Sequence, residues 1–218
     1  MIRVRFVNAV TLQGHRMRRE VAAMPRPDFL NLGSGPRGVE DPHWVNVDGF
    51  RDRRVEWLLD ITRPLPLGDE RVDGVFCEHV LEHFALEDGE AVASEAFRVL
   101  RPGGVLRVIV PDGELVMRRY FEAPDELVSR READRRLPMV AVNSFFRQRY
   151  EHQFLYDWPT MRQCLMRAGF RQVCRVAYRQ SCACPEIVLD DGKYEWESLY
   201  VEARKAPGVN DPAAVQTA

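Results

Sequence analysis

Residues 28–35 read Asp-Phe-Leu-Asn-Leu-Gly-Ser-Gly, a short apolar run that ends in a Gly-x-Gly turn. The run predicts a buried strand, because it is short and apolar and is bounded by a turn signal. A strand that stops at Gly33 and Gly35 lets a ligand approach bare backbone, since glycine has no Cβ. In open α/β sheets, ligands bind outside the carboxyl ends of the strands. This stretch therefore predicts where a ligand would lie.

Apolar runs alternate with helical patterns along the chain, which favours an α/β protein with a largely parallel sheet. The predicted parallel strands are 29–33, 44–48, 55–60, 72–78 and 105–110. Two later strands are expected to form an antiparallel hairpin at the sheet edge, at 171–178 and 197–203. The clearest helical patterns cover 88–100, 113–121 and 160–168.

Acidic residues end two of these strands, at Asp48 and Asp60, and residues 98–104 read Arg-Val-Leu-Arg-Pro-Gly-Gly. This order resembles the class I S-adenosylmethionine-dependent methyltransferases, in particular the small bacterial methyltransferase type 11-like family. The resemblance spans 28–205, and the 98–104 phrase is its most specific part. It implies a Rossmann-like fold, a mostly parallel seven-stranded sheet with a C-terminal antiparallel hairpin. It also implies a methyltransferase that uses S-adenosyl-L-methionine.

The same resemblance assigns a set of cofactor contacts. Asp48 is expected to bind the ribose, because a carboxylate accepts two hydrogen bonds from a diol. Asp60 is expected to hold the adenine amino group, and the alternative that it caps the following turn stays open. Asn31 replaces the acidic residue of many relatives, and its amide can still bind the methionine amino group. The full set is Asn31, Gly33, Ser34, Gly35, Asp48, Asp60, Ile61, Cys77 and Glu78.

Residues 33–38 also fit G-x-G-x-x-G, the dinucleotide-binding fingerprint. That motif needs a helix that begins inside it and an acidic residue about 20 positions later. Pro42 and the short spacing leave little room for a helix, and Asp48 arrives early. NAD(P) is therefore disfavoured.

Residues 77–84 read Cys-Glu-His-Val-Leu-Glu-His-Phe and contain H-x-x-E-H, a zinc-peptidase pattern. The segment directly follows a strand and lacks a long helix, so no metal is predicted. Many small-molecule methyltransferases carry Val-Leu-Glu-His here, beside the acceptor pocket. The resemblance makes His79 and His83 candidate catalytic bases, because histidine titrates near neutral pH. The alternative that Glu82 and His83 only fix the loop stays open.

The insert at 112–158, after the fifth strand, is expected to form a lid over the substrate. Its end, 143–158, is dense in aromatic side chains beside Arg, Glu and His. A phrase such as His-x-Phe-Leu-Tyr-Asp at 152–157 also resembles a subset of small bacterial methyltransferases. His152 is therefore a further catalytic candidate, and the substrate-binding candidates are Tyr156, Asp157 and Tyr178. Packing of Tyr156 and His152 within the lid is an equally open alternative.

Residues 1–205 are expected to form a single methyltransferase-like domain, and 206–218 a disordered tail. Only ten residues separate Gly33 from Trp44, and only six separate Asp48 from Val55. A parallel crossover usually needs a dozen or more residues, commonly including a helix. We therefore expect residues 1–27 to fold back and cover this half of the sheet.

The net charge of −2 gives no electrostatic reason to expect nucleic acid or membrane as a partner. No apolar run approaches the roughly 18 residues needed to cross a bilayer, and the N-terminus lacks a secretory layout. Five cysteines without paired spacing favour reduced thiols. The expectation is a cytoplasmic monomer or homodimer that acts on a small-molecule substrate.

The leading functional hypothesis is methyl transfer to a small-molecule nucleophile in bacterial secondary or polysaccharide metabolism. One alternative is intramolecular cyclisation of S-adenosylmethionine to a cyclic amino acid of the azetidine-2-carboxylate type, with release of methylthioadenosine. Another is a non-catalytic subunit that binds the cofactor. All three are compatible with one fold, because fold does not determine function.

Overall fold

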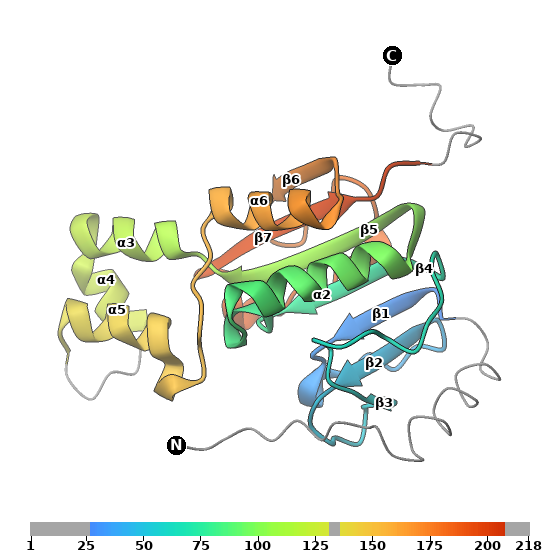
Figure 1. The fold of residues 1–218 in the computed structure, drawn as a ribbon. Helices are drawn as coiled ribbons and strands as arrows, with labels where there is room; N and C mark the ends of the chain where they lie inside the picture. Colours follow the sequence, from blue (N-terminus) through green and yellow to red (C-terminus); the bar gives the residue numbers. More distant parts are fainter. Residues whose placement is uncertain (1–26, 131–135, 208–218) are drawn as a thin grey trace.

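The computed structural model describes residues 27–130 and 136–207. Its centre is a seven-stranded sheet with the order β3-β2-β1-β4-β5-β7-β6 (Figure 1). Strands β1 to β5 pair in parallel, whereas β7 is antiparallel to both β5 and β6. The strands are β1 (Phe29–Leu32), β2 (Trp44–Asp48), β3 (Trp57–Leu58), β4 (Val72–Glu78), β5 (Leu100–Pro111), β6 (Gln172–Val176) and β7 (Ser198–Arg204).

This topology confirms the fold class predicted from the sequence, including the C-terminal antiparallel hairpin. The two largest differences concern strand length. β3 has only two residues, because only Val47 and Asp48 of β2 pair with it at this edge. β5 begins at Leu100, five residues earlier than predicted, because Leu100 already pairs with Val72 of β4.

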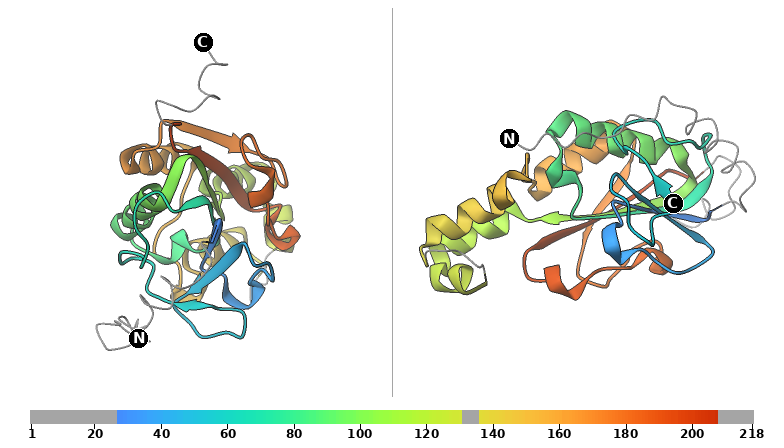
Figure 2. Two further views of the ribbon diagram at one scale, coloured as in Figure 1. Left: turned by 90° about the vertical axis from the view of Figure 1, so that its right-hand side faces the viewer. Right: turned by 90° about the horizontal axis from the view of Figure 1, so that it is seen from below.

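Two long helices, α2 (Leu86–Val99) and α6 (Trp158–Ala168), cover one face of the sheet (Figure 2). The ends of α6 follow ordinary capping rules. Asp157 accepts a hydrogen bond from the Thr160 N–H at 2.9 Å, and Gly169 ends the helix with φ of +116°. Over 27–130 and 136–207, no helix is long and apolar enough to cross a membrane.

The opposite face of the sheet is covered mainly by the loop 177–197 rather than by helices (Figure 2). Ile187 of this loop packs on Trp44, Phe76 and Tyr200 in a second apolar cluster. The loop contains two single-turn 3-10 helices, η4 (Pro185–Ile187) and η5 (Gly192–Tyr194). Within residues 27–130 and 136–207, the helix coverage usual for parallel sheets is therefore one-sided.

Arg107 fastens this loop to the sheet from the centre of β5. Its guanidinium is fully buried and donates from Nε to Asp190 at 2.7 Å and from Nη1 to Glu202 at 2.7 Å. A third bond, from Nη1 to the carbonyl of Gln180, measures 2.9 Å. The sequence pattern did not predict this network, because Arg107 lies within the otherwise apolar run 105–110.

The first two crossovers are as short as the spacing suggested. Only the 3-10 turn η1 (Gly35–Arg37) lies between β1 and β2, and the described chain has no helix between β2 and β3. The segment expected to cover this region, 1–27, lies outside the described residues except for its last position. Most of the tail expected from 206 onward also lies outside them.

The segment after β5 forms a helical lobe beyond the carboxyl end of that strand (Figure 1). It contains α3 (Gly113–Glu122), α4 (Pro124–Arg130), α5 (Pro138–Arg147) and the 3-10 turn η3 (Gln148–Tyr150). The lobe has its own small core, in which Val116, Leu127, Val142 and Phe145 are buried. Only α3 was predicted, because the alternating charges of α4 hide a single buried apolar position, Leu127.

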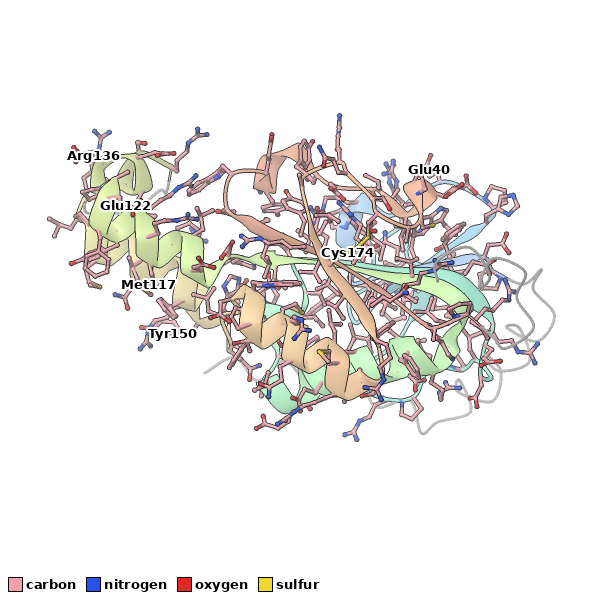
Figure 3. All side chains as sticks on the ribbon, turned by 90° about the horizontal axis from the view of Figure 1, so that it is seen from above. Glu40, Met117, Glu122, Arg136, Tyr150 and Cys174 are labelled. Carbon is pink, nitrogen blue, oxygen red and sulfur yellow. A yellow bond between two sulfur atoms is a disulfide. The ribbon has the colours of Figure 1, made fainter. Side chains whose placement is uncertain are left out.

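Cys174 and Cys182 are joined as a disulfide, which differs from the expected reduced thiols (Figure 3). Their spacing of eight residues carries no recognisable pattern. The pairing arises because the chain turns back on β6 directly after the strand, which brings Cys182 beside Cys174. Cys77 and Cys164 are buried free thiols.

Candidate functional site

A cavity of about 1060 Å³ opens at the carboxyl ends of β1, β2 and β4, where a ligand was expected. Its walls come from the β1 turn, the ends of β2 and β3, the segment after β4 and the end of the lid. The lining residues are Gly33, Asp48, Gly49, Phe50, Leu59, Ile61, His79, Val80, His83, Phe84, Arg149, Tyr150, Glu151 and Gln153.

The turn after β1 needs glycine at its first position. Gly33 has φ of +71°, and a Cβ added there would overlap with the side chain of Val80. The N–H groups of Gly33 and Ser34 donate to the carbonyl of Val47, at 2.7 and 3.2 Å. Gly35 also has a positive φ, and a Cβ there would meet open space. The turn thus places Gly33 at the cavity, whereas Gly35 is not among the lining residues.

Asp48 ends β2 with its carboxylate fixed by two backbone groups. Oδ2 accepts from the N–H of Gly35 at 2.8 Å, and Oδ1 accepts from the N–H of Phe50 at 2.7 Å. Each oxygen keeps a second lone pair, and Asp48 lines the cavity. This pre-oriented carboxylate suits a vicinal diol such as a ribose.

The end of the cavity beyond Asp48 is apolar. Leu59 and Ile61 follow β3, and Phe84 follows β4. Asp60 lies between the first two but accepts bonds from the N–H and hydroxyl of Thr62, at 3.0 and 2.6 Å. Its side chain therefore caps the turn, and the apolar wall is the part of this region that suits a flat heteroaromatic ring.

A smaller cavity of about 300 Å³ adjoins the same glycine turn. Here Arg37 Nη1 lies 3.1 Å from Glu78 Oε2 and 3.1 Å from Asp191 Oδ2. Burial raises the pKa of Glu78 above its ordinary value, although the Asp191 N–H and Arg37 oppose this. The buried hydroxyl of Ser34 has no hydrogen-bond partner in the described chain. A zwitterionic amino acid would match this set, with its ammonium at Glu78 and its carboxylate at Arg37.

Two of the expected cofactor contacts are engaged in the protein core. Asn31 is buried and donates from Nδ2 to Asn46 Oδ1 at 3.1 Å, although it also lines the smaller cavity. Cys77 is buried in the main core, the larger apolar cluster between the sheet and helices α2 and α6. Burial raises the pKa of its thiol far above the ordinary value. Cys77 is therefore a neutral packing residue at neutral pH.

His79 occupies a strained position directly after β4, with φ of +52°. Its ring stacks on Tyr194 at a centroid distance of 3.9 Å. Nε2 lies 2.9 Å from Ser198 Oγ, and Nδ1 lies 3.2 Å from Glu82 Oε1. Both ring nitrogens thus face protein groups, although the residue also lines the main cavity.

The H-x-x-E-H segment contains one 3-10 turn, η2 (Leu81–His83), instead of the long helix that a zinc peptidase needs. Glu82 is fully buried, and burial alone would raise its pKa, but His79 and two further histidines hold that pKa below its ordinary value. His83 lines the cavity, with its ring edge-on to that of His152 at 4.9 Å. Burial lowers the pKa of His152 despite the neighbouring carboxylate of Glu82.

The three substrate-binding candidates are absent from the cavity lining. Tyr156 is fully buried in the main core, with its hydroxyl against Gly89 of α2. Asp157 caps α6. Tyr178 packs near Tyr200 on the opposite face of the sheet, at a centroid distance of 6.0 Å.

The lid side of the cavity is instead formed by the residues just before that phrase. Arg149 and Tyr150 have left-handed backbone conformations, and they line the cavity with Glu151 and Gln153. Tyr150 is 81% exposed (Figure 3). The sequence pattern predicted that this aromatic segment contributes to the site. It did not predict which of its residues line the cavity, because backbone direction decides which side chains face inward.

Comparisons with known proteins agree with this geometry. A family model described as "Methyltransferase domain" matches residues 44–108. No curated protein matches the chain. A S-adenosylmethionine-dependent methyltransferase from Archaeoglobus fulgidus aligns over 89% of this chain and 93% of its own, with 17% identity and a TM-score of 0.53. A chain from the complex between the Haloferax volcanii Trm112 methyltransferase activator and a methyltransferase aligns over 89% of this chain and 90% of its own, with 16% identity and a TM-score of 0.50.

At these identities the two solved structures show a shared fold, and the family match adds the methyltransferase domain over β2 to β5. The residues around the glycine turn fit the three parts of the cofactor: an amino acid, a ribose diol and a flat base. The chain therefore resembles the class I S-adenosylmethionine-dependent methyltransferases in its fold and matches a methyltransferase domain over residues 44–108, and this match indicates S-adenosylmethionine as the cofactor.

Proposed function

We propose that the protein transfers a methyl group from S-adenosylmethionine to a small-molecule nucleophile held between His83 and the lid residues Arg149–Gln153. The observation that carries this proposal is the continuity of the main cavity. It runs from Asp48 and Ile61, on the cofactor side, to Tyr150 and Gln153 under the lid. Its volume of about 1060 Å³ exceeds the roughly 300–1,000 Å³ of typical small-ligand sites. This supports room for cofactor and acceptor together.

When bound, the cofactor supplies a sulfonium methyl group: the acceptor lone pair forms the new bond to carbon, and sulfur keeps the electrons of the broken bond. Asp48 orients the ribose side through its two remaining lone pairs. Arg37 and Glu78 hold the amino-acid side. The lid residues exclude water above the reacting atoms and fix the acceptor in line, which supplies most of the rate in such reactions.

The first test is incubation of the purified full-length protein with S-adenosylmethionine, alone and with panels of hydroxyl, amine and thiol acceptors. Mass spectrometry resolves the products. S-adenosylhomocysteine that appears only with an acceptor supports the proposal. Methylthioadenosine formed without an acceptor, above the spontaneous rate, overturns it in favour of cyclisation. Tight cofactor binding with neither product across the panels contradicts it in favour of a non-catalytic role.

A matched pair of variants locates the acceptor side. Tyr150→Ala alters the cavity at the lid, whereas Phe121→Ala removes another exposed aromatic ring of the same lobe, 79% exposed and away from the cavity lining. With an active acceptor, Tyr150→Ala is expected to raise KM for that acceptor at least about threefold and to leave cofactor affinity unchanged. Phe121→Ala should leave both unchanged. Equal effects of the two changes would argue against an acceptor site under the lid.

A further inference from the structure

Three potential metal ligands converge beneath the lid side of the main cavity: Glu82, His83 and His152. One ligand atom from each lies within 4.8 Å of the other two. The side chains of Glu82 and His152 are 0% and 1% exposed, whereas His83 lines the cavity. The cluster is therefore buried on one side and open to the cavity on the other.

The chain brings these residues together through backbone contacts between two distant segments. The carbonyl of Glu82 accepts from the N–H groups of Gln153 and Phe154, at 2.8 and 3.1 Å. The side chain of Gln153 also donates to the carbonyl of His83 at 2.6 Å. These bonds hold η2 against the residues that follow His152, so the cluster is built by the fold and does not depend on flexible surface side chains.

His152 has the arrangement typical of a metal-binding histidine. Its Nδ1–H donates to the carbonyl of Phe145 at 2.7 Å, which fixes the ring and leaves the lone pair on Nε2. That nitrogen is buried, has no hydrogen-bond partner in the described chain and lies 4.0 Å from Glu82 Oε1. Metal-binding histidines almost always donate their other N–H to a carbonyl or carboxylate in this way.

Glu82 supplies the charge that such a site needs. Neither of its carboxylate oxygens accepts a hydrogen bond within the parts of the chain described. The nearest nitrogen atom, His79 Nδ1, lies 3.2 Å from Oε1. A buried carboxylate without hydrogen bonds is costly, and a coordinated cation would remove that cost.

We propose that Glu82, His83 and His152 bind one Zn²⁺ ion whose fourth coordination position is open to the cavity. Two histidines and one carboxylate with an open position form a known catalytic zinc set. The nitrogen ligands disfavour Mg²⁺ and Ca²⁺, which prefer oxygen. The open position would take an oxygen or sulfur atom of the acceptor and would favour loss of its proton to solvent; this role, unlike the metal site itself, rests on the proposed methyl transfer.

The ligand set differs from the one that the H-x-x-E-H pattern would imply. In that pattern the two histidines of the motif bind the metal and the glutamate acts as base. Here His79 faces Ser198 and Tyr194, and its place is taken by His152 from a segment about 70 residues later. Because the three ligands come from two distant segments, no sequence motif of fixed spacing would reveal them.

The test measures metal binding directly, without an acceptor. The full-length protein is stripped with a chelator and titrated with Zn²⁺ in competition with a chromophoric chelator. One tight site per chain is expected, and an excess of Mg²⁺ should not compete. His83→Gln and His152→Gln should each weaken Zn²⁺ binding by more than about 100-fold, the upper range for loss of even an outer-shell partner. The control His43→Gln, at an exposed histidine paired with Asp28, should bind as the unchanged protein does.

Two results would overturn the proposal: the absence of a stoichiometric tight site, or equal binding by the His83 and His152 variants and the unchanged protein. Circular dichroism and S-adenosylhomocysteine affinity establish that each variant folds. If His152→Gln does not fold, the partly exposed His83→Gln still decides the question. Because the titration contains no acceptor, a failure of methyl transfer leaves its result unaffected. Methyl transfer at full rate by metal-free protein would remove the role of the metal and leave methyl transfer standing.

Discussion

At the scale of single residues, Asp48 is the side chain on which the proposed cofactor site most depends. Its two oxygens are already oriented by the N–H groups of Gly35 and Phe50, so they can bind a diol without further ordering. Asp48→Asn removes the charge and replaces one acceptor with a donor. Hydrogen bonds to charged groups contribute about 1.5–3 kcal/mol, so the Kd for S-adenosylhomocysteine should rise about 10- to 150-fold.

Isothermal titration calorimetry measures this change. The matched control is Asp52→Asn in the same loop, where the carboxylate accepts from the N–H of Arg54 at 3.2 Å and does not line the cavity. The control should keep the Kd of the unchanged protein. A Kd for Asp48→Asn within about twofold of the control would show that the ribose lies elsewhere.

Gly33 gives a second prediction at this scale, on stability. Gly33→Ala should destabilise the protein by more than about 2 kcal/mol, because a left-handed conformation costs a non-glycine residue about 1–2 kcal/mol and the new Cβ overlaps with Val80. Denaturant unfolding measures the change, with Gly68→Ala as control at a site without positive φ. The double change Gly33→Ala with Val80→Ala should be less destabilising than the sum of the two single changes. Strict additivity would mean that the overlap with Val80 contributes nothing.

At the scale of elements, the buried ion network between β5 and the loop 177–197 gives the clearest prediction. Arg107→Met would leave Asp190 and Glu202 buried without their cation, which costs about 3–5 kcal/mol in comparable cases. The control Arg101→Met breaks a half-exposed pair with Asp73, expected to cost less than about 1 kcal/mol. Urea unfolding compares the two. A similar, small effect of both would mean that the loop is held by its apolar cluster alone.

The whole molecule should respond to its cofactor as a single cooperative unit. Ligand at 100 times Kd adds about 2.7 kcal/mol to the free energy of unfolding, which corresponds to roughly 5–11 °C in Tm for a chain of this size. Thermal scans with S-adenosylhomocysteine measure this shift. Asp48→Asn should show a much smaller shift at the same ligand concentration. An equal shift in both proteins would place the ligand away from β2.

Much of the architecture could be predicted from sequence, because buried strands and capped helices leave local signals. The run at 29–32 and Gly169, which ends α6, are of this kind. Other features depend on contacts between distant segments, and no local pattern reports them. The Arg107 network, the disulfide of Cys174 and the approach of His152 to Glu82 belong to this group.

The candidate site also has one part that local sequence signals predict and one part that they do not. The positions of Gly33, Asp48 and Ile61 at the cavity follow from strand order, since the carboxyl ends of parallel strands share one edge. The lid side does not follow, because it contains three left-handed residues in succession, 148–150, and no local pattern in the sequence signals them. Tyr156 and Asp157 therefore lie outside the cavity that their sequence neighbourhood forms.

The sheet order also has a consequence for synthesis on the ribosome. β5 is the longest strand, and its free edge is paired only by β7, Ser198–Arg204. Nearly ninety residues must be translated after β5 before this partner exists. During that interval the edge presents Val105-Leu-Arg-Val-Ile-Val110, a stretch suited to pairing with another chain. Nascent chains stalled before residue 198 should therefore be the species that chaperones bind and that aggregates most readily.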